Sequence, residues 1–264
     1  MEWWPAYLAL GAFAGFLAGL LGIGGGLIMV PILVFLFGAQ DFPERHVMHL
    51  ALGTAMSTIM FTAISSLRAH HAHGAVRWDV VKTITPGTVA GTLLGTVLVS
   101  ALPGRWAALV FTALVYYASV QMWFHIQPKP TRQLPGQAGM FAVGGVIGGI
   151  SSLLGAGGAL MTVPFLVRCN VRMHHAIGTS AATGFPIAVA GATGYILNGL
   201  KTQQLPEYSL GFVYLPALMW IVVASMLTAP AGARLAHRMP VRVLKKIFAV
   251  FLFALATRML TSLL

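Results

Sequence analysis

The sequence predicts an all-α polytopic membrane protein, and three observations carry this prediction. Of its 264 residues, 58% are hydrophobic and only 8% are charged, and the mean hydropathy is +0.84. Apolar stretches long enough for the roughly 20 residues that cross a hydrocarbon core recur along the whole chain. These stretches also fall into two similar sets. We therefore expect a single membrane domain made of two repeat halves, residues 1–132 and residues 133–264.

The apolar stretches leave no room for a soluble domain. A water-soluble surface of ordinary charge density could not be assembled from so few charged residues, so the lipid bilayer is the expected surrounding. There are eight stretches, and they cover residues 6–37, 47–66, 83–102, 106–125, 138–167, 176–197, 208–230 and 243–264.

The basic residues are interpreted as orientation signals. The chain has 16 Lys and Arg against 5 Asp and Glu, a balance that would suggest nucleic acid in a soluble domain. Here the cations flank apolar segments, as they do in membrane proteins. We therefore expect no nucleic-acid partner.

The two halves share motifs in the same order. Residues 19–31 read GLLGIGGGLIMVP, and residues 152–164 read SLLGAGGALMTVP. Residues 48–54 (MHLALGT) are followed in the second half by residues 173–179 (MHHAIGT). In addition, Pro86 and Pro216 are expected to interrupt the third stretch of each half. The repeat unit is therefore predicted to be four segments long.

Several of these motifs together resemble the TauE/SafE family. They are the paired glycine-rich motifs that end in Val-Pro, residues 176–180, and the segment 205–217. The resemblance covers nearly the whole chain and implies a multi-pass permease of the bacterial inner membrane, in a family with members linked to export of sulfite, sulfoacetate and related sulfur oxyanions. One departure is that residues 53–55 read Gly-Thr-Ala where residues 178–180 read Gly-Thr-Ser. This difference puts equal roles for the two halves in doubt.

The first stretch of each half is too long for one crossing and too short for two. Residues 6–37 would form a helix about 48 Å long at about 1.5 Å per residue, against a hydrocarbon core of about 30 Å. The consecutive glycines at 24–26 weaken a helix by roughly 1 kcal/mol each relative to Ala. We expect the helix to break there, and at the matching glycines of residues 138–167.

The charge distribution favours re-entrant hairpins at these breaks. If all eight stretches crossed the membrane, the cations would divide almost evenly between the two faces. If the first stretch of each half is a hairpin, one face carries 12 cations and the other carries 4, as the positive-inside rule requires. The halves would then be two inverted four-segment repeats, each with one re-entrant or broken hairpin and three transmembrane helices, and both glycine tips would lie near the midplane.

Free amide groups at such tips would attract an anion without any full charge. Hydroxyl groups on the helices that follow could add hydrogen bonds, although in membranes they often bond to their own backbone. The candidate substrate-binding residues are therefore Gly24, Gly25, Gly26, Thr54, Thr58, Gly157, Gly158, Thr179, Ser180 and Thr183. Two histidines at helix entrances, His49 and His174, are candidates for proton coupling, with interfacial capping as the alternative.

The expected function is that of a permease or exporter for a small sulfur-containing anion such as sulfite or an organosulfonate, by alternating access around a midplane site. A permease for another small anion or metabolite, or a membrane accessory subunit, is the alternative. The apolar stretches contain no acidic residue, so an enzyme is not expected. Neither is a cofactor. A homodimer remains open.

No metal site is expected either. The chain has a single cysteine, Cys169. The cluster of His70, His71 and His73 has metal-ligand spacing, but no cysteine or carboxylate supports it. These histidines are expected to lie in a solvated basic loop.

Overall fold

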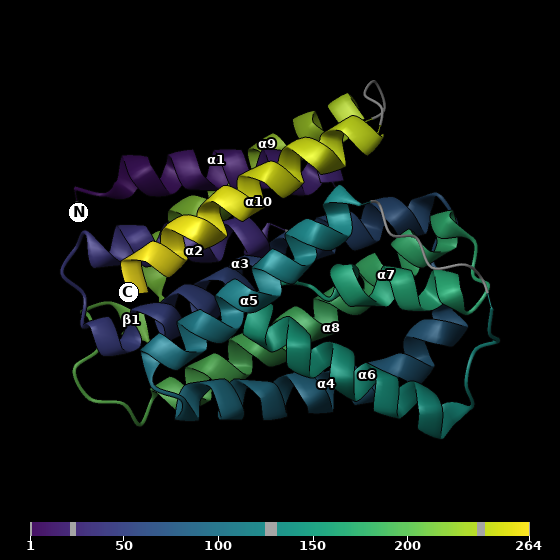
Figure 1. The fold of residues 1–264 in the computed structure, drawn as a ribbon, viewed down its shortest axis with the longest axis horizontal. Helices are drawn as coiled ribbons and strands as arrows, with labels where there is room; N and C mark the ends of the chain where they lie inside the picture. Colours follow the sequence, from purple (N-terminus) through teal and green to yellow (C-terminus); the bar gives the residue numbers. More distant parts are fainter. Residues whose placement is uncertain (1, 22–24, 125–130, 237–240, 264) are drawn as a thin grey trace.

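The computed structural model confirms the all-α fold (Figure 1). It describes residues 2–21, 25–124, 131–236 and 241–263. Over these residues the chain forms ten helices and one small antiparallel hairpin of β1 (Ser209–Leu210) and β2 (Val213–Tyr214). Seven of the described helices are long and apolar enough to cross a membrane. The chain is therefore a multi-pass membrane protein.

The two halves have the same order of helices. The first half contains α1 (Trp4–Leu21), α2 (Gly26–Gly38), α3 (Glu44–Ala72), α4 (Trp78–Ala101) and α5 (Gly104–Trp123). The second contains α6 (Gln137–Leu154), α7 (Ala159–Arg168), α8 (Met173–Gly199), α9 (Leu215–Ala236) and α10 (Val241–Leu263). In both halves the first apolar stretch forms two separate helices, so the predicted helix breaks are confirmed.

The helices run between two ends of the molecule (Figure 1). One end, here called the terminal end, holds the start of α1 and the end of α10, and α2 returns to it. The opposite end, here called the basic end, holds the start of α6, and α7 returns to it. Of the basic residues in the described ranges, four belong to the terminal end, namely Arg45, Arg105, Lys201 and Arg258. That the halves are inverted repeats remains a prediction.

Two helix pairs pack backbone to backbone. Helix α1 lies along α9, and α4 lies along α6. A Cβ atom built on Gly15 would meet Ser225 of α9, and one built on Gly19 would overlap the carbonyl oxygen of Ala229. In α4, Gly87 and Gly91 meet the backbone of α6 in the same way, and Gly95, at the same spacing, meets the hydroxyl of Ser152. Because no side chain separates these backbones, each pair is a rigid unit, as expected for small-residue packing in membranes.

The two prolines at 86 and 216 do not mark equivalent places. Pro86 lies inside α4, whereas Pro216 is in the first turn of α9, where a proline is tolerated because its missing N–H has no partner in any case. The packing instead makes Thr88 of α4 equivalent to Ser225 of α9. Thr88 contacts Gly148, and Ser225 contacts Gly15, which is the residue that matches Gly148 in the first half. The expected interruption of the third stretch is therefore wrong for Pro86, because α4 continues through it, whereas the stretch 208–230 becomes helical only at Leu215, beside Pro216.

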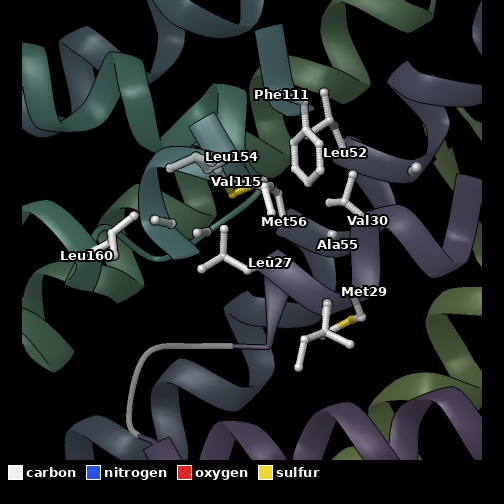
Figure 2. Packing of buried hydrophobic residues seen from close by; sticks show 14 of the residues in the cluster. Leu27, Met29, Val30, Leu52, Ala55, Met56, Phe111, Val115, Leu154 and Leu160 are labelled. Carbon is white, nitrogen blue, oxygen red and sulfur yellow. The ribbon is translucent and has the colours of Figure 1, made fainter. Parts of the chain in front are cut away.

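Helix α2 lies in the centre of the buried core (Figure 2). Its side chains Leu27, Met29 and Val30 are at most 1% exposed. They pack among buried side chains of α3 and α5, which include Leu52, Met56, Phe111 and Val115. This packing holds the first hairpin in place, because burying each large apolar side chain contributes about 1.5–3 kcal/mol.

Each half also binds the start of a helix from the other half. The hydroxyl oxygen of Thr54 in α3 accepts a hydrogen bond of 3.0 Å from the backbone N–H of Tyr214, where α9 begins. The hydroxyl oxygen of Thr179 in α8 accepts one of 3.1 Å from the backbone N–H of Arg77, where α4 begins. These bonds satisfy amides that precede a helix and have no intrahelical partner. We call them the cross-half latches.

The glycines that precede these threonines make the latches close-fitting. A Cβ atom on Gly53 would overlap the carbonyl oxygen of Phe212, and one on Gly178 would lie 2.6 Å from the carbonyl oxygen of Ala75. Each Gly-Thr pair therefore provides a flat backbone surface and a hydrogen-bond acceptor. The repeated motif has a structural role in joining the halves.

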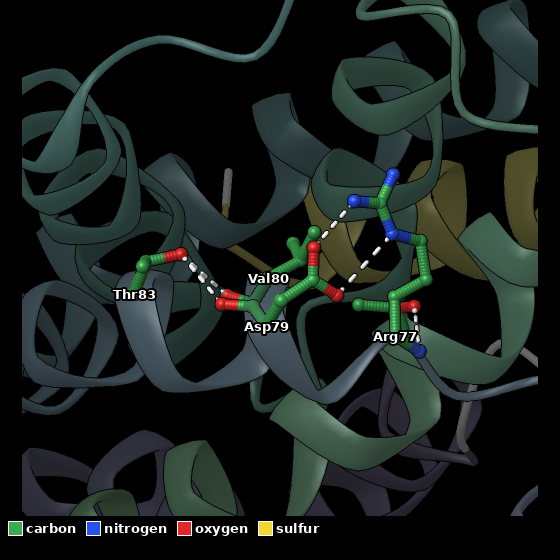
Figure 3. A network of polar contacts seen from close by, with 5 residues as sticks. Arg77, Asp79, Val80 and Thr83 are labelled. Atoms are coloured by element: carbon green, nitrogen blue, oxygen red, sulfur yellow. Dashed lines mark hydrogen bonds and ion pairs between the residues drawn. The ribbon is translucent and has the colours of Figure 1, made fainter.

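Side chains at the start of α4 form a small polar network (Figure 3). The Arg77 guanidinium pairs with the carboxylate of Asp79, and the Thr83 hydroxyl donates to the carbonyls of Asp79 (3.1 Å) and Val80 (2.9 Å). Asp79 lies in the first turn, where a negative charge is favourable. Since the ion pair is exposed, it contributes at most about 1 kcal/mol, and the buried latch at Thr179 matters more.

We expect single cysteines at positions 73 and 203 to label from opposite sides of the membrane. His73 lies at the basic end and Gln203 in the loop at the terminal end, and both are exposed. With the basic end in the cytoplasm, Gln203→Cys should react with an impermeant maleimide on intact cells. His73→Cys should react only after permeabilisation.

Native Cys169 gives little background in this experiment. It is buried, and burial raises the pKa of its thiol, so little reactive thiolate forms. Labelling of both introduced cysteines from the same side would contradict the arrangement in Figure 1.

Candidate functional site

The tips of the two hairpins meet in the middle of the molecule. A Cβ atom on Gly26 would overlap the carbonyl oxygen of Gly155, so the two backbones are in direct contact. Gly155 has a φ of 55° and Gly158 a φ of 81°, both in the left-handed region that favours glycine. The glycine clusters are therefore needed for the chain to turn and for the tips to touch. Gly24 lies outside the described residues.

A cavity of about 410 Å³ extends from the second tip toward the basic end. Helices α1 and α9 form one wall, and α3, α7 and α8 form the other. Its inner end is lined by Ile59, Gly157 and Gly184, whereas Ala69 and His70 lie near the basic end. The cavity lining thus runs from the second hairpin tip to the basic end.

Ser180, in the cavity wall, has a buried hydroxyl that is unpaired among the described residues. Its side chain is 1% exposed and lines the cavity wall, and its oxygen has no hydrogen-bond partner among the described residues. Leaving a buried hydroxyl unpaired costs about 1–3 kcal/mol. A bound ligand with a hydrogen-bond acceptor would remove this cost.

The N-terminus of α7 supplies further donors. Gly157 and Ala159 line the cavity. The backbone N–H groups of Met161 and Thr162 bond to the carbonyl of Gly158 at 3.1 and 2.9 Å, and the amides before them have no partner within the helix. A helix N-terminus carries a partial positive charge, equivalent to about half an elementary charge. These amides and the Ser180 hydroxyl together could hold an anion.

The remaining polar groups of the cavity are hydroxyls and one imidazole. Thr62, Ser65 and Ser66 of α3 lie along the path to His70. No carboxylate belongs to the cavity lining, and the other lining side chains are apolar, such as Met226 and those of several alanines. The cavity is therefore suited to an anion rather than a cation.

The structure brings two of the predicted substrate-binding residues, Gly157 and Ser180, into the cavity lining. Gly26 is packed at the tip contact and Gly25 faces Ala14. The other predicted residues lie in the structure as follows: Thr54 and Thr179 form the cross-half latches, Thr58 and Thr183 donate to carbonyls of their own helices at 2.9 and 3.0 Å, and Gly158 turns the chain into α7. A binding role for these residues remains a prediction.

The two candidate coupling histidines are in different surroundings, and neither lines the cavity. His49 is 3% exposed; its Nε2 donates to the carbonyl of Val99 at 3.0 Å, and its ring stacks on Phe212 at 5.1 Å. His174 is exposed and lies beside His175, with ring centroids 5.5 Å apart. A coupling role for both remains a prediction, and His49 also joins α3 to α4.

Sequence reasoning missed the polar face of α3 that lines the cavity. His70 was expected in a loop, but α3 continues to Ala72, so that expectation is wrong. Thr62, Ser66 and His70 are spaced by four residues and so share one helix face, a signal that the sequence does contain. In the part of the chain that the structure describes, no group of three His, Cys, Asp or Glu side chains could hold a metal ion.

The described chain thus has seven helices that could cross a membrane, two broken helices, and a cavity lined by α1, α3, α7, α8 and α9, an arrangement found in polytopic membrane transporters. The family model described as "Sulfite exporter TauE/SafE" matches residues 7–259. The chain belongs to this family.

Named relatives agree with this class. A probable membrane transporter protein of Haemophilus influenzae is 38% identical over 255 residues, which is 96% of each chain. The probable membrane transporter protein YdhB of Bacillus subtilis is 24% identical over 245 residues, 90% of this chain and 91% of its own length. A probable membrane transporter protein of Methanocaldococcus jannaschii is 23% identical over 240 residues, 88% and 85% of the two chains. No solved structure matches the chain.

We expect Ser180→Ala to leave the thermal stability unchanged or raised, because the change removes an unpaired buried hydroxyl. The same change should weaken anion binding by about 1.5–3 kcal/mol, the range for a hydrogen bond to a charged group, or roughly 10- to 150-fold. Melting of the purified protein and titration with an anion measure the two effects.

Thr183→Val is the matched control, one turn away on the same helix. Its hydroxyl already donates to the Ser180 carbonyl, so its loss should affect stability more than anion affinity. Wild-type anion affinity in Ser180→Ala would remove Ser180 from the site.

Proposed function

We propose that the protein is a permease that exports a small sulfur-containing anion, such as sulfite or an organosulfonate, across the inner membrane of a bacterial cell. The observation that carries the proposal is the buried donor set of Ser180 and the α7 N-terminus at the inner end of the cavity. A sulfur oxyanion offers several acceptor oxygens to such donors, and hydrogen bonds to an ionised group are about twice as strong as neutral ones. The description of the matching family supports the same cargo class.

A carrier of cations is less compatible with this cavity. Cation sites in membranes normally use buried carboxylates, whereas the cavity lining contains none. Catalysis would need a nucleophile with a base, or a metal with its ligands. The cavity lining offers hydroxyls without an adjacent carboxylate, so we propose transport without a chemical step.

Alternating access would follow from the two rigid helix pairs. The α1–α9 pair forms one wall of the cavity, and the α4–α6 pair packs on α8 at the other side. When Gly53-Thr54 is aligned with Gly178-Thr179, Met56 corresponds to Ala181. Ala181 lines the cavity, but Met56 is 0% exposed and packs against Gly191. We infer that the passage at the basic end is open in this structure and that its counterpart at the terminal end is closed.

The membrane potential can drive this export. The cavity contains no acidic side chain for a carboxylate proton relay. With the cell interior negative, an anion that leaves gains about 2.3 kcal/mol per charge per 100 mV, which is equivalent to roughly a fiftyfold gradient. By the positive-inside rule the basic end faces the cytoplasm, so the cavity would be loaded from inside the cell.

We expect purified protein in liposomes to carry sulfite or methanesulfonate down an imposed potassium-diffusion potential. The flux should persist when an ionophore collapses the pH gradient, because no second ion is required. Ser180→Ala should slow it. Absence of flux for every sulfur anion tested, with another anion or a neutral metabolite carried instead, would identify the cargo as a different one. Loss of flux with the pH gradient would show proton coupling.

We expect the two equivalent positions 181 and 56 to be reached from opposite sides. Ala181→Cys should react with a thiol reagent from the basic end, because it lines the open cavity. Met56→Cys should react more slowly and from the terminal end, during visits to the other state. Protection of Ala181→Cys by a transported anion would place the binding site in the same cavity. Reaction of both cysteines from one side would contradict alternating access.

A further inference from the structure

A hydrogen bond joins α8 to the end of α6 beside the second hairpin tip. The hydroxyl of Tyr195 in α8 donates to the backbone carbonyl of Ser152 at 3.0 Å. Tyr195 is 0% exposed, and Ser152 is in the last turn of α6. Close by, Thr96 of α4 packs against Gly194. This bond therefore ties the α4–α6 pair to α8 on the side where the cavity's counterpart is closed.

The equivalent pair at the basic end is His70 and Gly19. Aligning Gly53-Thr54 with Gly178-Thr179 places His70 of α3 at the position of Tyr195. Aligning the two glycine-rich motifs places Gly19 of α1 at the position of Ser152. Both His70 and Gly19 line the open cavity, from opposite walls. The imidazole of His70 makes no hydrogen bond to another described residue, and its charged neighbours are His73 and His174.

We propose that His70 holds the cavity closed at the basic end in the other state of the transporter. In that state its imidazole N–H donates to the carbonyl of Gly19 when the α1–α9 pair closes onto α3. This proposal rests on the alternating access of the proposed function, but not on the identity of the cargo. Gly19 is in the last turn of α1, whose final carbonyls have no partner within the helix. An imidazole carries an N–H donor in both of its protonation states.

The sizes of the residues around Tyr195 and around His70 are consistent with a hydrogen bond at each place. An imidazole reaches less far than a phenol, so the facing helix must come closer at the basic end. The residues there are Ala18 and Gly19, which are smaller than Ser151 and Ser152 at the terminal end. Smaller side chains allow a closer approach of helix backbones. In the closed state His70 would become buried as Tyr195 is now.

The reporter cysteines at 181 and 56 test the proposal without any substrate. His70→Leu removes the donor and should destabilise the state closed at the basic end. Labelling of Ala181→Cys should rise and that of Met56→Cys should fall, by roughly twofold to tenfold for the loss of one hydrogen bond. Tyr195→Phe should shift both reporters in the opposite direction. His70→Gln keeps an N–H donor and should label like the parent protein.

His73→Leu is the control on the same helix end, because His73 is exposed and donates to the carbonyl of Ala69. It should leave both reporters unchanged. His70→Phe is a second variant without a donor, to be used with the melting temperature if His70→Leu folds poorly. Unchanged labelling in both variants, or equal shifts in His70→Gln and His70→Leu, would overturn the proposal. Failure of the liposome flux assay with sulfur anions would instead reject the cargo.

Discussion

Backbone that stops being helical halfway across a membrane has to be shielded from lipid, and the contact between Gly26 and Gly155 provides this shield. Each backbone N–H or C=O left without a partner in hydrocarbon costs several kcal/mol. Two helix breaks at the same depth can cover each other only if their backbones touch, and any Cβ atom at Gly26 would prevent that. The left-handed φ of Gly155 then turns the chain away from the contact. The rest of the arrangement depends on these two tips staying together.

The packing of α1 and α6 follows from this constraint. Each is the first helix of a hairpin that returns to the end where it began, and each lies along a helix of the other half. Glycine-to-backbone contacts make these pairs rigid, and the cross-half latches at Thr54 and Thr179 fix where the partner helices begin. The two halves are interlocked, so we propose that the α1–α9 and α4–α6 pairs move in the transport cycle rather than the halves themselves.

Features that depend on local sequence could be predicted, whereas those that depend on facing elements could not. The composition predicted the membrane class, and the glycine clusters predicted both helix breaks. Thr54 and Ser180 could not be told apart in the same way, because both are buried hydroxyls near a repeated glycine. Only the structure shows that Thr54 accepts a bond from Tyr214 while Ser180 has no partner. The extent of α3, and hence the place of His70, also required knowledge of its neighbours.

One departure from the repeat is consistent with our proposal of a single anion site rather than two. Where the second half has Ser180, the first has Ala55, whose Cβ would lie 3.6 Å from a Cβ on Gly155 at the tip contact. A serine there would be buried without an evident partner, at a cost of about 1–3 kcal/mol. The contact also brings the Gly155 carbonyl to the first turn of α2, so a protein acceptor already faces that helix N-terminus.

We therefore propose that the ligand binds at the N-terminus of α7. Its amides and Ser180 belong to α7 and α8, which pack against each other, whereas the opposite wall of the cavity belongs to the α1–α9 pair. A site held by α7 and α8 can keep its geometry while the gates beside it open and close. Because its donors are uncharged, the site can also release the anion once the passage to the terminal end opens. Weak, pre-arranged hydrogen bonds suit a carrier better than a full positive charge would, since a carrier must bind its cargo on one side and release it on the other.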